Sequence, residues 1–191
     1  MRGADLVARA LGEDGVKTIF SLSGNQIMPI YDACIDVGIR LYHTRHEGAP
    51  GYMADAWAQV TGEVGVAMIT AAPGFANGLS PLYSALMAES PMLLLSGDSP
   101  RGQDSLGAFQ ELDQVAMSAP VTKLSFRSDR VENLGHDIAR AIRVARSGRP
   151  GPVHLALPFD LLNADAAGGY LPSGNDFEAQ VLSPAKSLVG N

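Results

Sequence analysis

The stretch RHEGAPGYMADAWA, Arg45–Ala58, places a carboxylate between a short apolar segment and a helix. The preceding residues 39–42 read as a strand, and alanines at positions 54, 56 and 58 allow the following helix to pack closely. In open α/β sheets, ligands bind beyond the carboxyl ends of the strands. Glu47 therefore stands where chemistry is expected, although the helix dipole alone also favours a glutamate in the first turn.

Apolar strands and amphipathic helices alternate on both sides of this stretch. We expect strands at 16–22, 39–43, 64–70, 91–96, 121–126 and 152–157. Helices are expected at 3–14, 26–37, 47–60, from a loop at 71–78 to about residue 89, 110–116 and 131–146. The run at 64–70 is almost wholly apolar, which is typical of a strand covered on both faces. The pattern predicts an α/β fold, a doubly wound three-layer sandwich with a six-stranded parallel sheet.

The alternation stops after Asp160. From residue 163 to 191 the residues Gly, Pro, Ser and Asp are scattered without a sustained period, which is typical of a linker. We therefore expect one domain over residues 1–162 and, over residues 163–191, a linker toward a middle domain that is missing here.

Composition narrows the classes of function. The 191 residues carry a net charge of −6 without a cluster of lysine and arginine, which argues against nucleic-acid binding. No apolar run reaches the length of a membrane span. The single cysteine, Cys34, excludes an internal disulfide and favours a cytoplasmic protein. Because only 18% of the residues are charged, we expect an apolar face that meets another chain or domain.

The loops with informative residues all follow expected strands and would share one edge of the sheet. They are residues 23–26, 46–47, 72–77, 97–98 and 109–111. Taken singly they are weak, since Gly24 is commonly a turn glycine and Gln110 is equally well explained as a helix start. The glycine spacing of dinucleotide- and phosphate-binding loops is absent. The four histidines lack metal-ligand spacing, so no metal site is expected in this chain.

Several short motifs follow one another along residues 3–160. They are GAD at 3–5, MPIYDA at 28–33, RHEGA at 45–49, PG at 73–74 with Asn77, AFQE at 108–111, TK at 122–123 and SGRPGPV at 147–153. Together they resemble the N-terminal pyrimidine-binding domain of thiamine-diphosphate enzymes, in the superfamily of acetolactate synthase and the 2-keto acid decarboxylases. The number of matching elements makes chance a poor explanation.

The resemblance implies a catalytic role for Glu47. That carboxyl would hydrogen-bond the pyrimidine ring of thiamine diphosphate, so that the cofactor's own amino group can take the proton from its thiazolium ring. By the same likeness Gly24, Asn25, Pro73 and Asn77 would line the pyrimidine pocket. A carboxyl group that shares a proton in this way should lie in a poorly solvated pocket.

The resemblance also implies a substrate side of the site. Phe109, Gln110 and Lys123 would face a 2-keto acid, with Gln110 close enough to the reaction to count as catalytic. Two departures from acetolactate synthases leave another decarboxylase or carboligase open. Residues 21–25 read SLSGN without the usual Pro-Gly-Gly, and residues 71–72 read AA instead of Ser-Gly.

Finally, the resemblance implies that half of the cofactor site lies on another domain. Enzymes of this family hold the diphosphate and its Mg²⁺ through a Gly-Asp-Gly…Asn-Asn motif on a separate domain, and this sequence does not contain it. We therefore expect the chain alone to be inactive and to form its site with the diphosphate-binding domain of a partner subunit, in a homodimer or homotetramer. FAD in the full-length enzyme is left open. The alternatives are a separate small subunit of a two-subunit decarboxylase, and a non-catalytic module that keeps the fold.

Overall fold

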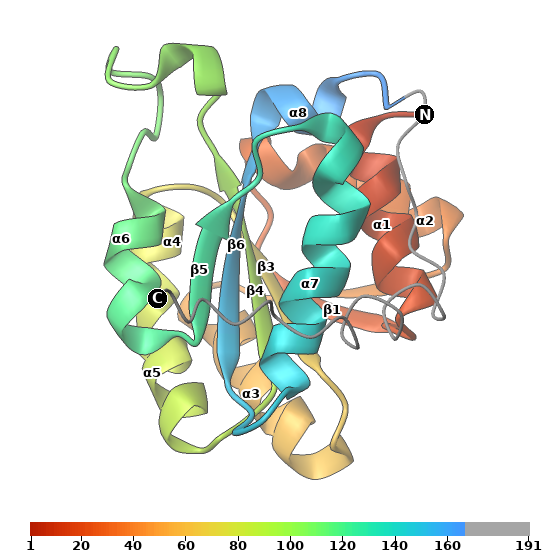
Figure 1. Ribbon diagram of the computed structural model, residues 1–191, viewed down its shortest axis with the longest axis vertical. Helices are drawn as coiled ribbons and strands as arrows, with labels where there is room; N and C mark the ends of the chain where they lie inside the picture. Colours follow the sequence, from red (N-terminus) through yellow and green to blue (C-terminus); the bar gives the residue numbers. More distant parts are fainter. Residues whose placement is uncertain (167–191) are drawn as a thin grey trace, which may run out of the picture.

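The computed structural model describes residues 1–166, which form a parallel sheet between two layers of helices (Figure 1). The strands are β1 (Thr18–Ser21), β2 (Arg40–His43), β3 (Gly65–Ile69), β4 (Met92–Asp98), β5 (Leu124–Arg127) and β6 (Pro152–Pro158). Their order in the sheet is β2-β1-β3-β4-β6-β5, and every pairing is parallel. The predicted doubly wound α/β fold with six parallel strands is confirmed.

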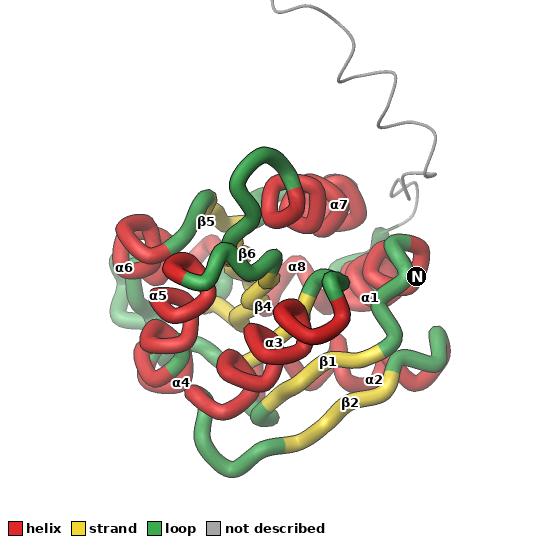
Figure 2. The backbone as a smooth tube through the Cα atoms, turned by 90° about the horizontal axis from the view of Figure 1, so that it is seen from below, coloured by secondary structure: helices red, strands yellow, loops and turns green. Residues whose placement is uncertain are grey.

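The first helix layer covers the larger apolar core. It consists of α1 (Gly3–Glu13), α2 (Met28–Asp36), α7 (Leu134–Arg146) and α8 (Phe159–Asn163), and α1 contacts the other three (Figure 2). The apolar residues of α1 recur at helical spacing, so that Leu6, Val7 and Leu11 are all fully buried. Gly15, with φ of 85°, lets the chain turn after this helix and enter β1.

The second helix layer covers a smaller core that contains polar groups. It consists of α3 (Gly48–Thr61), α4 (Pro73–Asn77), α5 (Leu79–Met87) and α6 (Gln114–Ser118). Its apolar cluster includes Phe75, Leu82 and Leu94. His154 on β6 is buried on this side, where its ring lies 4.5 Å from that of Phe75 and its Nε2 lies 2.9 Å from Ser96 Oγ.

None of the helices within residues 1–166 is both long and apolar enough to cross a membrane. The other helical segments are single 3₁₀ turns: η1 (Asn25–Ile27), η2 (Arg101–Gln103), η3 (Ala119–Val121) and η4 (Val131–Asn133).

Two local predictions were wrong. The expected loop at 71–78 contains the helix α4, because Pro73 stands at its first position with a φ already suited to a helix. The helix expected at 110–116 begins only at Gln114, because Gln110 has a left-handed backbone with φ of 59°. That conformation cannot belong to an α-helix, so the chain stays irregular up to Asp113.

The fold continues past the predicted domain end at residue 162. Ala164 accepts a hydrogen bond from the Gly3 amide at 3.0 Å, and the Ala166 amide donates to the Met1 carbonyl at 2.8 Å. Asp165 pairs with Arg2 in an isolated antiparallel bridge. Residues 164–166, assigned to the linker, are thus bonded to residues 1–3, at and before the start of α1. The linker prediction for residues 167–191 lies outside the described residues.

Candidate functional site

The order of the strands reverses between β1 and β3. From β1 the chain moves outward to β2, and it then returns across β1 to form β3 on the other side. In doubly wound sheets a crevice for ligands forms at such a point, beyond the carboxyl ends of the two strands. The loop after β1 carries Gly24 and Asn25, and the loop after β3 leads into α4. The sequence-predicted cofactor residues therefore come from both sides of this crevice.

Glu47 lies at the same edge, directly before the first residue of α3. Its carboxylate is half-buried, and Oε2 accepts a hydrogen bond of 3.0 Å from the Asn77 side chain at the end of α4. No residue within 1–166 donates to its other oxygen, Oε1. The fold thus brings Glu47 and Asn77 together across 30 residues of sequence and leaves one carboxylate oxygen for another donor.

Two glycines pack closely against Thr70, and one of them, Gly74, also lies beside Glu47. A Cβ atom on Gly74 would lie 3.4 Å from Glu47 Oε1 and only 2.6 Å from Thr70 Cγ2. A Cβ atom on Gly24 would lie 2.3 Å from Thr70 Cβ, closer than real Cβ contacts allow. Any larger residue at either position would displace Thr70 and narrow the crevice. Pro73 is exposed beside them and begins α4.

Thr70 is a residue that reasoning from the sequence missed. It follows the last residue of β3, and its hydroxyl donates to Gln26 Oε1 at 2.8 Å. Gln26 is itself buried, so this bond ties the loop after β1 to the loop after β3. The signal in the sequence was a threonine at the end of an apolar strand, which is too common to single out.

Ala72 and Gln114 form a second connection that was missed. Ala72 has the rare backbone angles φ 46° and ψ −102°, which a non-glycine residue adopts at a cost of order 1–3 kcal/mol. The buried Gln114 side chain holds it there, since its Oε1 accepts from the Ala72 amide at 3.1 Å. Its Nε2 donates to the Gly97 carbonyl at 3.0 Å. One side chain thereby joins the ends of β3 and β4 to the start of α6.

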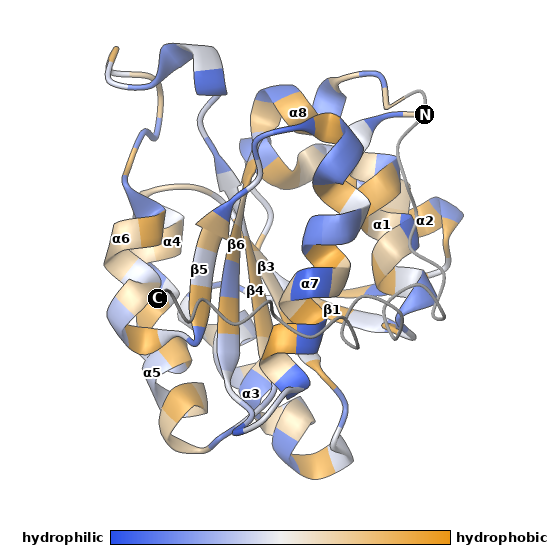
Figure 3. Ribbon diagram, viewed as in Figure 1, coloured by the Kyte–Doolittle hydropathy of each residue, from blue (hydrophilic) through white to orange (hydrophobic). Residues whose placement is uncertain are grey.

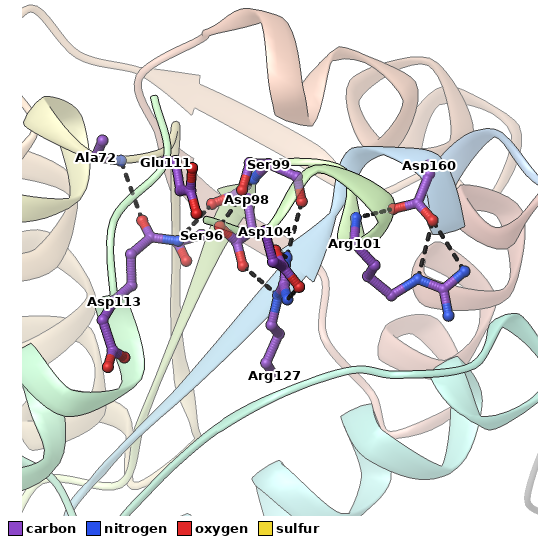
Figure 4. A network of polar contacts seen from close by, with 12 residues as sticks. Ala72, Ser96, Asp98, Ser99, Arg101, Asp104, Glu111, Asp113, Arg127 and Asp160 are labelled. Atoms are coloured by element: carbon purple, nitrogen blue, oxygen red, sulfur yellow. Dashed lines mark hydrogen bonds and ion pairs between the residues drawn. The ribbon is translucent and has the colours of Figure 1, made fainter. Parts of the chain in front are cut away.

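Residues 99–113 form a projecting segment, which we call the arm. It leaves the end of β4, extends beyond the helices and returns to α6, as the green segment at the upper left of Figure 1 shows. Arg127 on β5 holds its base, with two nitrogens donating to Asp104 at 2.8 and 3.0 Å and one to the Ser99 carbonyl at 3.0 Å (Figure 4). Arg101 pairs with Asp160 at 2.9 Å and so fastens the outgoing part of the arm to α8.

The charges at the base of the arm are unequally exposed. Arg127 Nε lies 2.6 Å from Asp98 Oδ2, an ion pair whose N–H is not aligned as a hydrogen bond. Burial raises the pKa of Asp98, and the charge of Arg127 only partly opposes this effect. The hydrogen bonds from Arg127 lower the pKa of the exposed Asp104. Both aspartates contact Arg127 and line, with Glu111, a cavity of about 240 Å³ beneath the arm.

The arm carries two of the predicted substrate residues. The Phe109 side chain is 74% exposed, and it lines a cavity of about 160 Å³ together with Asn25 and Gln26. Gln110 turns its Oε1 inward, where this buried atom accepts no hydrogen bond from residues 1–166. The fold therefore brings Phe109 to the loop after β1, next to a predicted cofactor residue.

Lys123 is not brought to this edge, which corrects its prediction as a substrate residue. It immediately precedes β5, so it lies at the amino ends of the strands, opposite to the crevice. Its ammonium group donates to the carbonyls of Val144, at 2.5 Å, and Ser147, at 2.6 Å. Burial lowers the pKa of this group. Lys123 therefore caps the carboxyl end of α7, a common role for lysine.

Within residues 1–166 no cluster of three or more His, Cys, Asp or Glu side chains is arranged to hold a metal ion. The prediction that Mg²⁺ is held by another domain stays a prediction.

Comparison with known proteins points to one family. Residues 1–117 match the family model described as thiamine pyrophosphate enzyme, N-terminal TPP binding domain. The chain is 42% identical over 164 residues to acetolactate synthase isozyme 3 large subunit of Escherichia coli, covering 85% of this chain and 29% of that protein. It is 40% identical over 160 residues to 2-hydroxyacyl-CoA lyase 2 of Danio rerio, covering 84% of this chain and 26% of that protein.

A third relative is acetolactate synthase large subunit IlvG of Mycobacterium tuberculosis, 38% identical over 160 residues that cover 84% of this chain and 29% of that protein. The chain thus spans less than a third of the length of these curated relatives.

Proposed function

Because this chain belongs to the thiamine pyrophosphate enzymes, through their N-terminal TPP binding domain, we propose that it is the pyrimidine-binding half of an enzyme that decarboxylates or joins 2-keto acids. The observation that carries the proposal is the carboxylate of Glu47, fixed by Asn77 on one oxygen and open on the other. This carboxylate lies at the reversal of the strand order, where ligands of such sheets bind.

The residues present fit a pyrimidine ring. A flat heterocycle needs open space on both sides of its ring and one acid within hydrogen-bonding distance of its ring nitrogen. Gly24 and Gly74 add no side chain of their own beside Thr70, and Gly74 lies next to Glu47 Oε1. When bound, thiamine diphosphate would supply a carbon acid whose deprotonated form can attack a carbonyl and accept the electrons of a broken carbon–carbon bond.

Each side chain then has a defined task. With the cofactor bound, Glu47 Oε1 would share a proton with the ring nitrogen. Asn77 keeps the carboxylate from rotating, since its amide nitrogen occupies Oε2. Thr70 and Gln26 keep the two loops of the crevice at a fixed separation. Water remains near the half-buried Glu47 in this chain alone, so a second domain must cover the site for efficient proton transfer.

The surface of the second helix layer supports such a partner domain. Its outward side exposes large apolar residues on the neighbouring helices α3 and α5, among them Tyr52, Val60, Tyr83 and Met87. Apolar residues gathered on one side of a protein commonly mark an interface. We propose that the diphosphate-binding domain of a partner subunit, with its Mg²⁺, covers the site from this side in a homodimer or homotetramer.

A second candidate reaction is the cleavage of 2-hydroxyacyl-CoA. The specific observation is that the identity to 2-hydroxyacyl-CoA lyase 2, 40%, nearly equals the 42% identity to an acetolactate synthase. Both reactions break or form a carbon–carbon bond beside a carbonyl carbon, so the pyrimidine half of the site would be the same. The complete enzyme should therefore be assayed with pyruvate and, separately, with a 2-hydroxyacyl-CoA.

The decisive variant is Glu47→Gln, tested in the complete enzyme with thiamine diphosphate and Mg²⁺. Glutamine keeps the shape and can still accept from Asn77, but it cannot share a proton. We expect turnover to fall at least about 100-fold, the usual contribution of a positioned acid or base. Undiminished turnover would refute the assignment.

The matched control is Glu13→Gln, which removes an exposed carboxylate from the end of α1. It should keep wild-type turnover and melting temperature. If the wild-type assembly fails to bind thiamine diphosphate by calorimetry, the chain is instead a non-catalytic module that keeps the fold.

A further inference from the structure

We propose that Glu111 is a positioning residue. Its carboxylate folds the tip of the arm, residues 105–110, and thereby presents Phe109 and Gln110 to the substrate. This inference rests on the proposed function for the nature of the substrate, a 2-keto acid. The folding of the tip itself is a property of the described chain and can be measured without any substrate.

The contacts of Glu111 converge on one short piece of backbone. Its Oε1 accepts a hydrogen bond from the Ser105 amide, and its Oε2 accepts from the amides of Gly107 at 3.0 Å and Ala108 at 3.2 Å. Three backbone donors therefore share one carboxylate, and all three precede the residues that the tip presents. Hydrogen bonds to a charged acceptor are among the stronger ones in proteins.

The backbone of the tip needs such an external support. Ser105, Gly107 and Gln110 all have left-handed backbone angles, with φ of 63°, 73° and 59°. Only glycine adopts this region at little cost, so Ser105 and Gln110 are strained. Strained residues persist where surrounding contacts fix them. For Ser105 and Gly107 those contacts come from Glu111, since both residues are exposed and lie outside the apolar core.

The tip presents two different surfaces beside Glu111. The Phe109 ring points outward and reaches the cavity shared with Asn25. Gln110 offers a buried amide oxygen that accepts no hydrogen bond within residues 1–166. An unpaired buried acceptor is costly, so it favours a donor group from outside the described chain. A 2-keto acid carries no such donor, so the substrate would meet the N–H groups of this amide, while a covering domain would supply the donor to Oε1.

The base of the arm does not depend on Glu111. Arg127 and Arg101 fasten the arm to β5 and α8 (Figure 4). Gln114, directly after the arm, donates to the Gly97 carbonyl on β4. Loss of the Glu111 carboxylate should therefore loosen the tip alone, while the crevice around Glu47 keeps its geometry.

The test compares Glu111→Gln with the wild type in the complete enzyme. Hydrogen–deuterium exchange of the amides at 105, 107 and 108 should become at least about tenfold faster, since each loses a charged acceptor. With pyruvate as substrate, KM should rise about tenfold, kcat should change less than about twofold, and the affinity for thiamine diphosphate should stay the same. Glu111→Asp, which keeps the charge on a shorter side chain, should recover part of both effects.

Two further variants distinguish the positioning role of Glu111 from direct contact with the substrate and from a general effect of removing a negative charge. Gln110→Ala removes a presented group but leaves Glu111, so it should raise KM without faster exchange at 105–108. Glu63→Gln removes an exposed carboxylate next to the amino end of β3, far from the arm, and should change neither measurement.

Unchanged exchange in Glu111→Gln would overturn the inference, and so would faster exchange with an unchanged KM. A wild-type enzyme that binds no thiamine diphosphate and does not turn over pyruvate would overturn the proposed function instead. In that case the exchange result would still decide whether Glu111 folds the tip.

Discussion

The two faces of the sheet are built in opposite ways. Under α1, α2, α7 and α8 the core is extensive and apolar, and the outward side of α7 is strongly polar (Figure 3). Under α3, α5 and α6 the apolar cluster is smaller, and His154 is buried there among the hydroxyls of Ser96, Ser118 and Ser125. The outward side of that layer exposes Tyr83 and Met87, at 58% and 61%.

This difference separates stability from function. The first face buries the larger apolar core and carries most of its charged groups outside, although Met28 and Ile35 on α2 are exposed. The second face carries Glu47 at the start of α3 and buried polar groups that need exact partners, and it leaves apolar surface in water. We infer that the first face supplies most of the stability of the chain and that the second is completed by another domain.

A pair of neighbours on β4 tests this difference most strongly. Leu93 faces the first core and Leu94 the second, and both are fully buried. We expect Leu93→Ala to lower the free energy of unfolding by about 3–5 kcal/mol and Leu94→Ala by about 2–3 kcal/mol, because the smaller core can relax around the cavity more easily. Urea unfolding of both variants measures this. Equal losses would break the comparison.

The pH dependence of stability tests the polar side of the second core. Burial lowers the pKa of His154 from its ordinary value of 6.5 to about 3. Protonation is therefore disfavoured in the folded state, so stability is full above pH 6.5 and is lost as the pH falls toward 3. The expected slope is about 1.4 kcal/mol per pH unit within this window. Urea unfolding between pH 7 and pH 4 should show a flatter slope for His154→Gln, and an identical slope would contradict the assignment.

The outward surfaces should show the smallest effect on the stability of the chain. Met87→Glu on α5 and Arg9→Glu on α1 both change an exposed residue, and each should alter the free energy of unfolding by less than about 0.5 kcal/mol. Only Met87→Glu should weaken subunit association, by about five- to thirtyfold, because it places a charge in the proposed interface. Analytical ultracentrifugation of the complete enzyme distinguishes the two. Equal association would argue against this face as the interface.

The sheet and the position of Glu47 could be predicted from the sequence because they depend on local patterns. Apolar runs such as 64–70 specify strands covered on both faces, and Glu47 follows a strand at its carboxyl end. The pairing of Glu47 with Asn77 could not be read from either residue, because it depends on how α3 and α4 meet in space.

The arm is the region whose structure could least be predicted from the sequence. Its left-handed residues Ser105 and Gln110 carry no local signal, since neither is glycine. Glu111 reads as the start of a helix, yet its carboxylate accepts from three amides that precede it. Lys123 was placed by likeness to a family, and only the topology shows that it lies at the other edge of the sheet.

The contact between the two ends of the described chain has a consequence for folding during synthesis. The bonds from Gly3 to Ala164 and from Ala166 to Met1 join residues that a ribosome makes first and last in this stretch. At about 5–20 residues per second, synthesis of residues 1–166 takes on the order of ten to thirty seconds. During all of it α1 lacks the cover of α8, so the nascent domain closes only when its final residues emerge.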